Sequence, residues 1–98
     1  MTQKRFSPKK QITQKNVEAL SQKSAGVYRI TDNRGETLYI GKAKASRLGD
    51  RIYEHKGRFK GGTNFRVKET GTVERAERLE KSLIKSEKPP RNRMLKRK

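Results

Sequence analysis

The sequence predicts a small α+β domain: a three-stranded antiparallel sheet flanked by helices, in the order β-β-α-β-α, with disordered basic tails. Two observations carry this prediction. A turn sequence joins two short apolar arms into a hairpin, and an alternating segment stands between two stretches with helical spacing of apolar residues. The chain has 98 residues, of which 29% are hydrophobic, so we expect one domain with a lean core.

The hairpin is predicted for residues 26–41. Residues 26–30 and 37–41 form its arms, and the Asp-Asn-Arg-Gly sequence between them is typical of a tight turn. Each arm carries one tyrosine, Tyr28 and Tyr39, so strand pairing would bring the two side chains together. Tyrosines in strands are usually packing residues. Position alone therefore leaves both a structural and a chemical role open for them.

A helix is predicted to begin near Ser46. Its apolar face comprises Leu48, Ile52 and Phe59. His55 lies on this face, with Arg51 one turn before it, while Gly49 weakens the first turn and makes Asp50 a candidate N-cap. A single histidine on an apolar face is more often a satisfied core residue than a catalyst, and both roles remain open for His55.

The third strand is predicted at residues 64–69, where apolar and polar residues alternate, and Thr72 is expected to cap a second helix. The apolar stripe of this helix comprises Val73, Ala76, Leu79, Leu83 and Ile84. At about 100° per residue Glu80 falls inside that stripe. A carboxylate facing a core is costly unless it is paired or holds a cation. Glu80 is therefore expected either to pair with a lysine or to bind a metal.

The charge of the chain favours nucleic acid as a partner. The net charge is +17, of which residues 1–25 carry +5 and residues 88–98 carry +6. Phosphate backbones bind such surfaces through counterion release. We expect a basic flexible arm at 1–15, a folded domain at 16–92 that opens with a short helix over 17–22 capped by Asn16, and a basic tail at 93–98.

Composition excludes several classes of protein. There are no cysteines, so disulfides and thiolate metal sites are absent. No apolar run approaches the roughly 20 residues of a membrane span, and no apolar stretch near Met1 resembles a secretory signal. We expect a cytoplasmic, DNA-associated protein with no membrane partner.

The hairpin sequence resembles the signature of the GIY-YIG nuclease family, in Gly26-Val-Tyr28 followed by Tyr39-Ile-Gly41. Arg51 and His55 stand four apart, similar to the helical arginine and proton-handling residue of that family. Glu80 precedes Asn92 by twelve residues, similar to the metal glutamate and closing asparagine. The resemblance covers residues 24–92, and residues 39–44 are most similar to the subgroup found in the incision subunit of bacterial nucleotide-excision repair.

Two departures concern the segment around the first helix. The interval from Gly41 to Arg51 is two residues longer than usual in the family, so the loop or the helix start must differ. A histidine four residues after the arginine, as His55 is, makes this position more similar to homing and restriction members than to repair-type members.

The resemblance implies a role for each of these side chains. Glu80 would bind a single divalent cation, Mg²⁺ or Mn²⁺, at the scissile phosphate. Tyr28 or Tyr39 would activate or orient the attacking water. Arg51 would stabilise charge on the phosphoryl group, and His55 would assist proton transfer or the leaving group.

The resemblance also implies supporting residues. Gly26 and Gly41 would allow close packing beside the site, and Asn92 would hold the C-terminal segment by hydrogen bonds. The residues expected to contact nucleic acid are Lys42, Lys44 and Arg47.

We therefore predict a metal-dependent DNA endonuclease with low sequence specificity that prefers branched or nicked DNA, with specificity supplied by a larger complex or partner. The alternative is a non-catalytic protein that keeps the fold and binds DNA or RNA.

Overall fold

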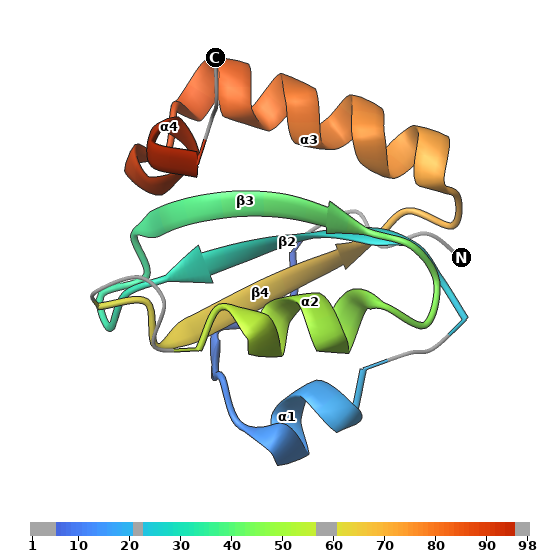
Figure 1. Ribbon diagram of the computed structural model, residues 1–98, viewed down its shortest axis with the longest axis horizontal. Helices are drawn as coiled ribbons and strands as arrows, with labels where there is room; N and C mark the ends of the chain where they lie inside the picture. Colours follow the sequence, from blue (N-terminus) through green and yellow to red (C-terminus); the bar gives the residue numbers. More distant parts are fainter. Residues whose placement is uncertain (1–5, 21–22, 57–60, 96–98) are drawn as a thin grey trace.

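The computed structural model describes residues 6–20, 23–56 and 61–95 of the chain, and Figure 1 shows their arrangement. The elements are β1 (Lys10–Gln11), α1 (Gln14–Glu18), β2 (Gly26–Thr31), β3 (Thr37–Ala43), α2 (Leu48–Glu54), β4 (Asn64–Glu69), α3 (Val73–Glu87) and α4 (Pro90–Leu95). The predicted hairpin and the strand at residues 64–69 are both present. None of the helices in these ranges is long and apolar enough to cross a membrane.

The sheet is antiparallel with the strand order β1-β4-β2-β3, so β3 forms one edge and β1 the other. In the hairpin, Tyr28 pairs with Gly41 and Ile30 pairs with Tyr39. Because alternate residues of a strand share a face, the two tyrosines lie on one face as diagonal neighbours. The α+β class is confirmed, but the sheet has four strands where the sequence predicted three.

The additional strand belongs to the N-terminal segment. Ser7 N donates to Val67 O, and Val67 N donates to the Ser7 side chain, so this segment lies along β4. Ile12 follows and is 4% exposed. The prediction of disorder up to residue 15 is wrong for these described residues, because backbone pairing with a sheet edge does not depend on a rich apolar composition.

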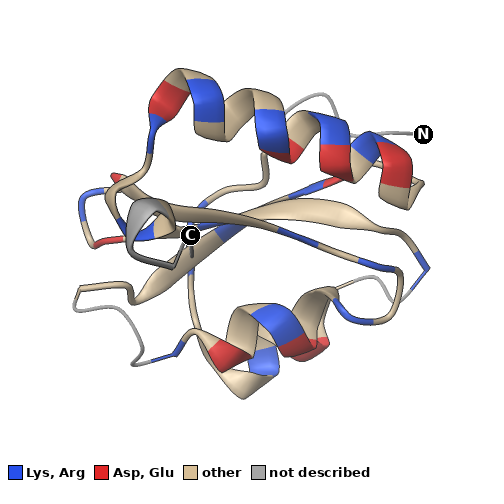
Figure 2. Ribbon diagram, turned by 45° about the horizontal axis from the view of Figure 1, so that its top comes forward, with Lys and Arg blue, Asp and Glu red and all other residues tan. Residues whose placement is uncertain are grey.

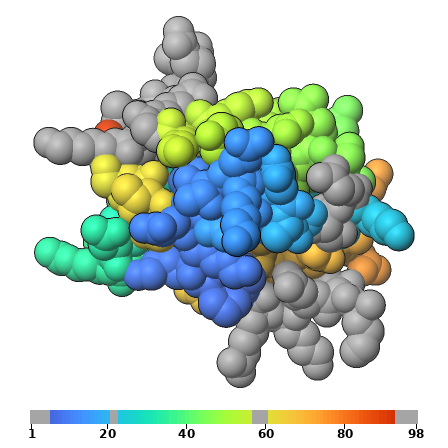
Figure 3. Space-filling model, turned by 90° about the horizontal axis from the view of Figure 1, so that it is seen from below, coloured from blue at the N-terminus to red at the C-terminus, as the bar shows by residue number. Residues whose placement is uncertain are grey.

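The short helix α1 starts earlier than predicted. Its N-cap is Thr13, whose side chain accepts a hydrogen bond from Asn16 N at 3.1 Å, so Asn16 is not the cap. Val17 is buried as expected, whereas residues 21–22 of the predicted helix lie outside the described residues. Figure 3 shows this N-terminal segment, in blue, packed beside the green α2 on the lower side of the molecule.

Helices cover both faces of the sheet, with α3 and α4 above it and α1 and α2 below it in Figure 1. The core beneath is formed by Ile12, Val17, Tyr28, Ile30, Ala43, Leu48, Ile52, Phe65 and Val67. The core above is formed by Ala25, Val27, Ile40 and Ala76, against which Phe6, Leu79, Leu83 and Ile84 pack. The result is a three-layer domain with the sheet in the middle.

The start of α2 also differs from the prediction. Its N-cap is Arg47, which makes no side-chain capping bond, and Asp50 lies inside the helix. Gly49 has a packing reason, since a Cβ there would lie 2.9 Å from the Val17 carbonyl oxygen. Only glycine therefore lets α2 approach α1 this closely. Phe59, expected on the same helix, lies outside the described residues.

The second predicted helix corresponds to α3. Thr72 caps it as expected and accepts a hydrogen bond from Arg75 N at 3.2 Å. The helix ends at Lys88, which has a left-handed φ of 49°. Pro90 then opens α4, which the sequence did not predict. Proline fits the first turn of a helix as well as the end of one, so its presence alone did not separate the two outcomes.

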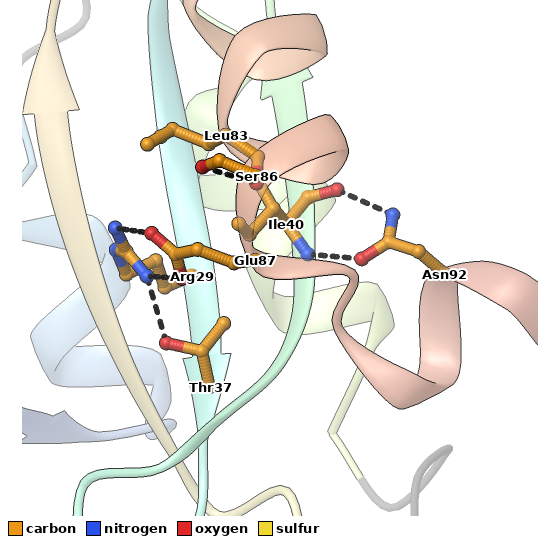
Figure 4. A network of polar contacts seen from close by, with 7 residues as sticks. All are labelled: Arg29, Thr37, Ile40, Leu83, Ser86, Glu87 and Asn92. Carbon is orange, nitrogen blue, oxygen red and sulfur yellow. Dashed lines mark hydrogen bonds and ion pairs between the residues drawn. The ribbon is translucent and has the colours of Figure 1, made fainter.

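Two contacts attach the C-terminal helices to the sheet (Figure 4). The guanidinium of Arg29 donates to both carboxylate oxygens of Glu87, at 2.6 and 2.8 Å. Asn92 Nδ2 donates to Ile40 O at 2.9 Å, and Ile40 N donates to Asn92 Oδ1 at 2.8 Å. These contacts fix the end of α3 and the start of α4 over the hairpin.

Candidate active site

A pocket of about 290 Å³ opens beside the C-terminal half of β3. It is lined by Tyr28, Tyr39, Lys42, Ala43, Lys44, Arg51, Val73 and Glu80. These residues come from β2, β3, the loop after β3, α2 and α3. Four of the five residues predicted to be catalytic therefore line one pocket, and only His55 does not.

Tyr28 forms the inner wall of the pocket because Gly41 lies opposite it on β3. A Cβ at position 41 would overlap the hydroxyl and ring of Tyr28. The absence of a side chain lets the Tyr28 ring cross the neighbouring strand, where its centroid is 6.2 Å from that of Tyr39. Gly26 has a comparable constraint at the start of β2, since a Cβ there would lie 2.7 Å from the Lys68 carbonyl oxygen.

His55 lies behind Tyr28, at the C-terminal end of α2. A hydrogen bond of 2.9 Å joins His55 Nε2 to the Tyr28 hydroxyl, and the His55 ring centroid is 4.7 Å from that of Tyr39. His55 is only 5% exposed. It is thus buried in the core, and its hydrogen bond to Tyr28 connects it to the pocket.

Burial raises the pKa of the Tyr28 hydroxyl well above its ordinary value, and the neighbouring Tyr39 raises this pKa further. The hydroxyl therefore keeps its proton near neutral pH. It can donate that proton to Nε2 of a neutral His55 while its oxygen accepts a hydrogen bond from the pocket side.

Glu80 faces the sheet from α3 and lies 3.5 Å from Lys42 Nζ. The Glu80 side chain is 16% exposed and that of Lys42 is 38% exposed. Lys42 is reached because it shares the α3-facing side of β3 with Ile40, two residues earlier. The ion pair with a lysine, one of the two roles expected of Glu80, is therefore present, and the carboxylate still lines the pocket.

The remaining basic residues divide into two groups. Arg51 and Lys44 line the pocket, and the Arg51 side chain is 53% exposed with Glu54 at 4.0 Å. Arg47 does not line the pocket; its guanidinium lies 3.7 Å from Asp50 and 4.0 Å from Glu54. Of the three residues predicted to contact nucleic acid, Lys42 and Lys44 thus line the pocket, whereas Arg47, the N-cap of α2, does not.

The residues meet around the edge strand β3 and not on a single face of the sheet. Tyr28 and Tyr39 lie on the face of the sheet that packs toward α2, whereas Lys42 lies on the face that α3 covers, where it pairs with Glu80. They share a pocket because β3 is the last strand, so side chains from both faces can reach around it.

The donor set is compatible with a hard divalent cation. Among the described residues no group of three or more His, Cys, Asp or Glu side chains could hold a metal. Mg²⁺ commonly keeps several waters and binds through one or two carboxylates together with substrate phosphates. Glu80, the only carboxylate among the lining residues, could supply that single ligand.

Two comparisons with known proteins agree with this geometry. A sequence model of the GIY-YIG catalytic domain matches residues 24–94. The chain is also 38% identical over 84 residues to the UvrABC system protein C of Chromohalobacter salexigens, an alignment that covers 74% of this chain. It covers 13% of that relative, so the chain spans only a small part of the length of the curated protein it matches.

The family match extends over the hairpin, α2, β4 and α3, and so includes all the elements that line the pocket. The predicted family resemblance and the predicted class of enzyme are both confirmed. The chain belongs to the GIY-YIG family and carries its endonuclease catalytic domain.

Proposed function

We propose that this chain hydrolyses phosphodiester bonds in DNA with the help of one divalent cation bound at Glu80, with low sequence specificity. The observation that carries the proposal is the composition of the pocket: one carboxylate, three cationic side chains and two tyrosines line a single opening. Cations suit the phosphate charge, and a carboxylate suits the metal. A packing site would have no use for this combination.

A bound Mg²⁺ or Mn²⁺ would polarise the scissile phosphate and stabilise the charge that develops on it. Glu80 would hold that ion, and Lys42 and Lys44 would contact phosphate oxygens. Arg51, which is exposed at the mouth of the pocket, would pair with the phosphoryl oxygens and stabilise added negative charge there.

The hydrogen bond between Tyr28 and His55 suggests how protons move. Tyr28 would accept a proton from the attacking water while passing its own proton to His55 Nε2, so no free tyrosinate has to form in the buried site. In this scheme His55 acts through Tyr28 and does not touch the substrate. Tyr39 would orient the water or the phosphate from the neighbouring strand.

Substrate choice is proposed from the charge of the chain and from its relative. Lysine and arginine contacts to phosphates position a protein without reading bases, so we expect structure to matter more than sequence. The relative is named as a component of the UvrABC system. We propose by analogy that this chain works on branched or nicked DNA, with a partner or a larger assembly supplying specificity.

A cleavage assay tests the proposal. Supercoiled, linear and branched DNA are incubated with the protein in Mg²⁺, in Mn²⁺ and in EDTA, beside the variants Glu80→Ala and Glu77→Ala. Glu77 is the matched control, because it lies on the outer surface of the same helix and pairs with Lys81. We expect metal-dependent nicking that Glu80→Ala abolishes and Glu77→Ala retains.

Equal nicking by wild type and Glu80→Ala would contradict the assignment of Glu80 to the metal. Salt-sensitive binding of DNA or RNA without cleavage in any of the three conditions would favour the alternative, a non-catalytic binding protein.

A further inference from the structure

We propose that Lys42 is a resident counter-ion of Glu80 that must leave before a divalent cation can bind, so that metal and DNA bind to this pocket cooperatively. The inference rests on the proposed function, because it assumes that Glu80 is the metal ligand. It adds a second role for Lys42. In the free protein its ammonium group pairs with the Glu80 carboxylate, and in the complex with DNA it moves to a phosphate.

The geometry of the pair favours exchange of partners. Lys42 Nζ reaches Oε1 of Glu80 at 3.5 Å, which is within ion-pair range but longer than a strong charge-assisted hydrogen bond. The Lys42 side chain is 38% exposed and ends in a flexible four-carbon stem, so the ammonium can swing toward the pocket mouth. Both residues line the same pocket, so a phosphate entering it would meet Lys42 directly.

The charge balance of the pocket supplies the coupling. Its lining holds three cations, Lys42, Lys44 and Arg51, and one carboxylate, Glu80. A divalent cation entering the free pocket would displace Lys42 from its partner and add two further positive charges near the other cations. A phosphodiester brings negative charge for Lys42, for Arg51 and for the metal itself, so it removes the repulsion that opposes metal binding.

Linkage makes this effect reciprocal: if DNA raises the affinity for the metal by some factor, the metal raises the affinity for DNA by the same factor. Lys42 should contribute to that factor specifically. Lys44 provides the comparison, since it lines the same pocket with the same charge and forms no ion pair with Glu80 among the described residues.

Mn²⁺ titration followed by electron paramagnetic resonance tests the proposal without measuring cleavage. The full chain is used in a Tyr28→Phe background, to prevent turnover, with four forms: otherwise unchanged, Lys42→Met, Lys44→Met and Glu80→Gln. Each is titrated alone and again with a saturating short DNA duplex. Methionine keeps most of the length of the lysine stem while removing its charge.

Without DNA, we expect Lys42→Met to bind Mn²⁺ about fivefold more tightly than the unchanged form, the size typical of losing a partly exposed ion pair. Lys44→Met should change this affinity by less than about twofold, since it breaks no ion pair with Glu80. The factor by which DNA raises Mn²⁺ affinity should be smaller in Lys42→Met than in the unchanged form, because the competing ammonium is already gone.

An Mn²⁺ affinity of the free protein that is unchanged or lowered in Lys42→Met, or raised equally in Lys44→Met, would overturn the proposal. The result for Glu80→Gln separates this failure from that of the proposed function. If Glu80→Gln binds Mn²⁺ as well as the unchanged form with and without DNA, the metal assignment itself is wrong. If Glu80→Gln loses binding while Lys42→Met gains nothing, only the role of Lys42 fails.

Discussion

Glu80 and Glu87 stand seven residues apart on α3, two turns of the helix, and both pair with a cation of the sheet below. Glu87 receives two hydrogen bonds from Arg29, at 2.6 and 2.8 Å. Glu80 has one contact with Lys42 at 3.5 Å. The side chain of Glu80 is nevertheless the more buried of the two, with 16% exposure against 35% for Glu87.

The more buried of these two glutamates therefore has the weaker contact with its cationic partner. The planar guanidinium of Arg29 matches a carboxylate, donates further to Thr37 and lies 4.4 Å from the Phe6 ring, so Glu87 is part of a fixed network. A carboxylate that is more buried and less satisfied is costly for stability alone. The contacts of Glu87 hold the end of α3 on the sheet, and the weaker pairing of Glu80 supports the proposal that this carboxylate binds a metal ion.

The largest expected effect separates these two glutamates. Glu80→Gln should lower the rate of DNA nicking by at least about 100-fold, because the amide cannot hold a divalent cation in place of the carboxylate. Its melting temperature should stay within a few degrees of wild type. Initial nicking rates on supercoiled DNA and a thermal melt of each variant measure both quantities.

Glu87→Gln is the matched variant on the same helix face. It should retain nicking within about threefold of wild type while lowering the melting temperature, since it removes an ion pair far from the pocket. An equal loss of nicking in Glu87→Gln and Glu80→Gln, at a temperature where both variants are folded, would contradict the assignment of different roles to these two glutamates.

The two tyrosines that line the pocket with Glu80 provide a further test of its catalytic role. Tyr28→Phe should lower the nicking rate by about 100-fold, because it removes the hydroxyl that joins the pocket to His55. Tyr39→Phe keeps the ring contacts and should lower the rate less. A larger loss in Tyr39→Phe would move the proton-handling role to that residue.

The attachment of the C-terminal helices to the sheet is tested by Asn92→Ala. The change removes two hydrogen bonds to the Ile40 backbone, so we expect a loss of about 1–2 kcal/mol in the free energy of unfolding, or about 5–10 °C in melting temperature. Denaturant unfolding measures it. Asn92→Asp is a matched variant that keeps the acceptor for Ile40 N and loses the donor to Ile40 O. Its free energy of unfolding should therefore lie between those of wild type and Asn92→Ala.

The smallest expected effect is a pH dependence of stability. The hydrogen bonds from Arg29 lower the pKa of Glu87 below its usual value of 4.5. A carboxyl with a lowered folded-state pKa adds stability that is present above its unfolded pKa and is lost as pH falls through the folded one. Wild type should therefore exceed Glu87→Gln by about 1 kcal/mol at pH 7, a value reduced by solvent screening. The difference should shrink as pH falls below 4.5 and vanish once Glu87 is protonated in the folded protein, and a difference that persists in the protonated form would show that packing, not charge, is responsible.

The parts of this structure that could be predicted from sequence are those with local signals. The turn residues located the hairpin, period-two alternation located β4, and Thr72 with its apolar stripe located α3. The same arithmetic placed Glu80 and His55 inward, because a helix face is a property of spacing alone.

The parts that sequence did not reveal depend on partners distant along the chain. Ser7 lies along β4, and Arg29 finds Glu87 across 58 positions. Neither contact has a local signal. The placement of the site around the edge strand was missed for a similar reason. It depends on the order of strands in the sheet, and residues 26–41 carry no signal that β3 is an edge strand. Lys42 as the partner of Glu80 could have been found, because alternation along β3 places it beneath α3.

The side chain of Asn92 has a consequence beyond fastening α4. An edge strand exposes backbone donors and acceptors to any other extended chain, and natural proteins obstruct such edges to prevent aggregation. The Asn92 amide presents one donor and one acceptor to Ile40, as a residue of a neighbouring strand would. β3 is therefore closed midway along its length by a single side chain that imitates a fifth strand. Further along the same strand Lys42 and Ala43 line the pocket, so the obstructed part of the edge directly precedes the part at which we propose that the substrate binds.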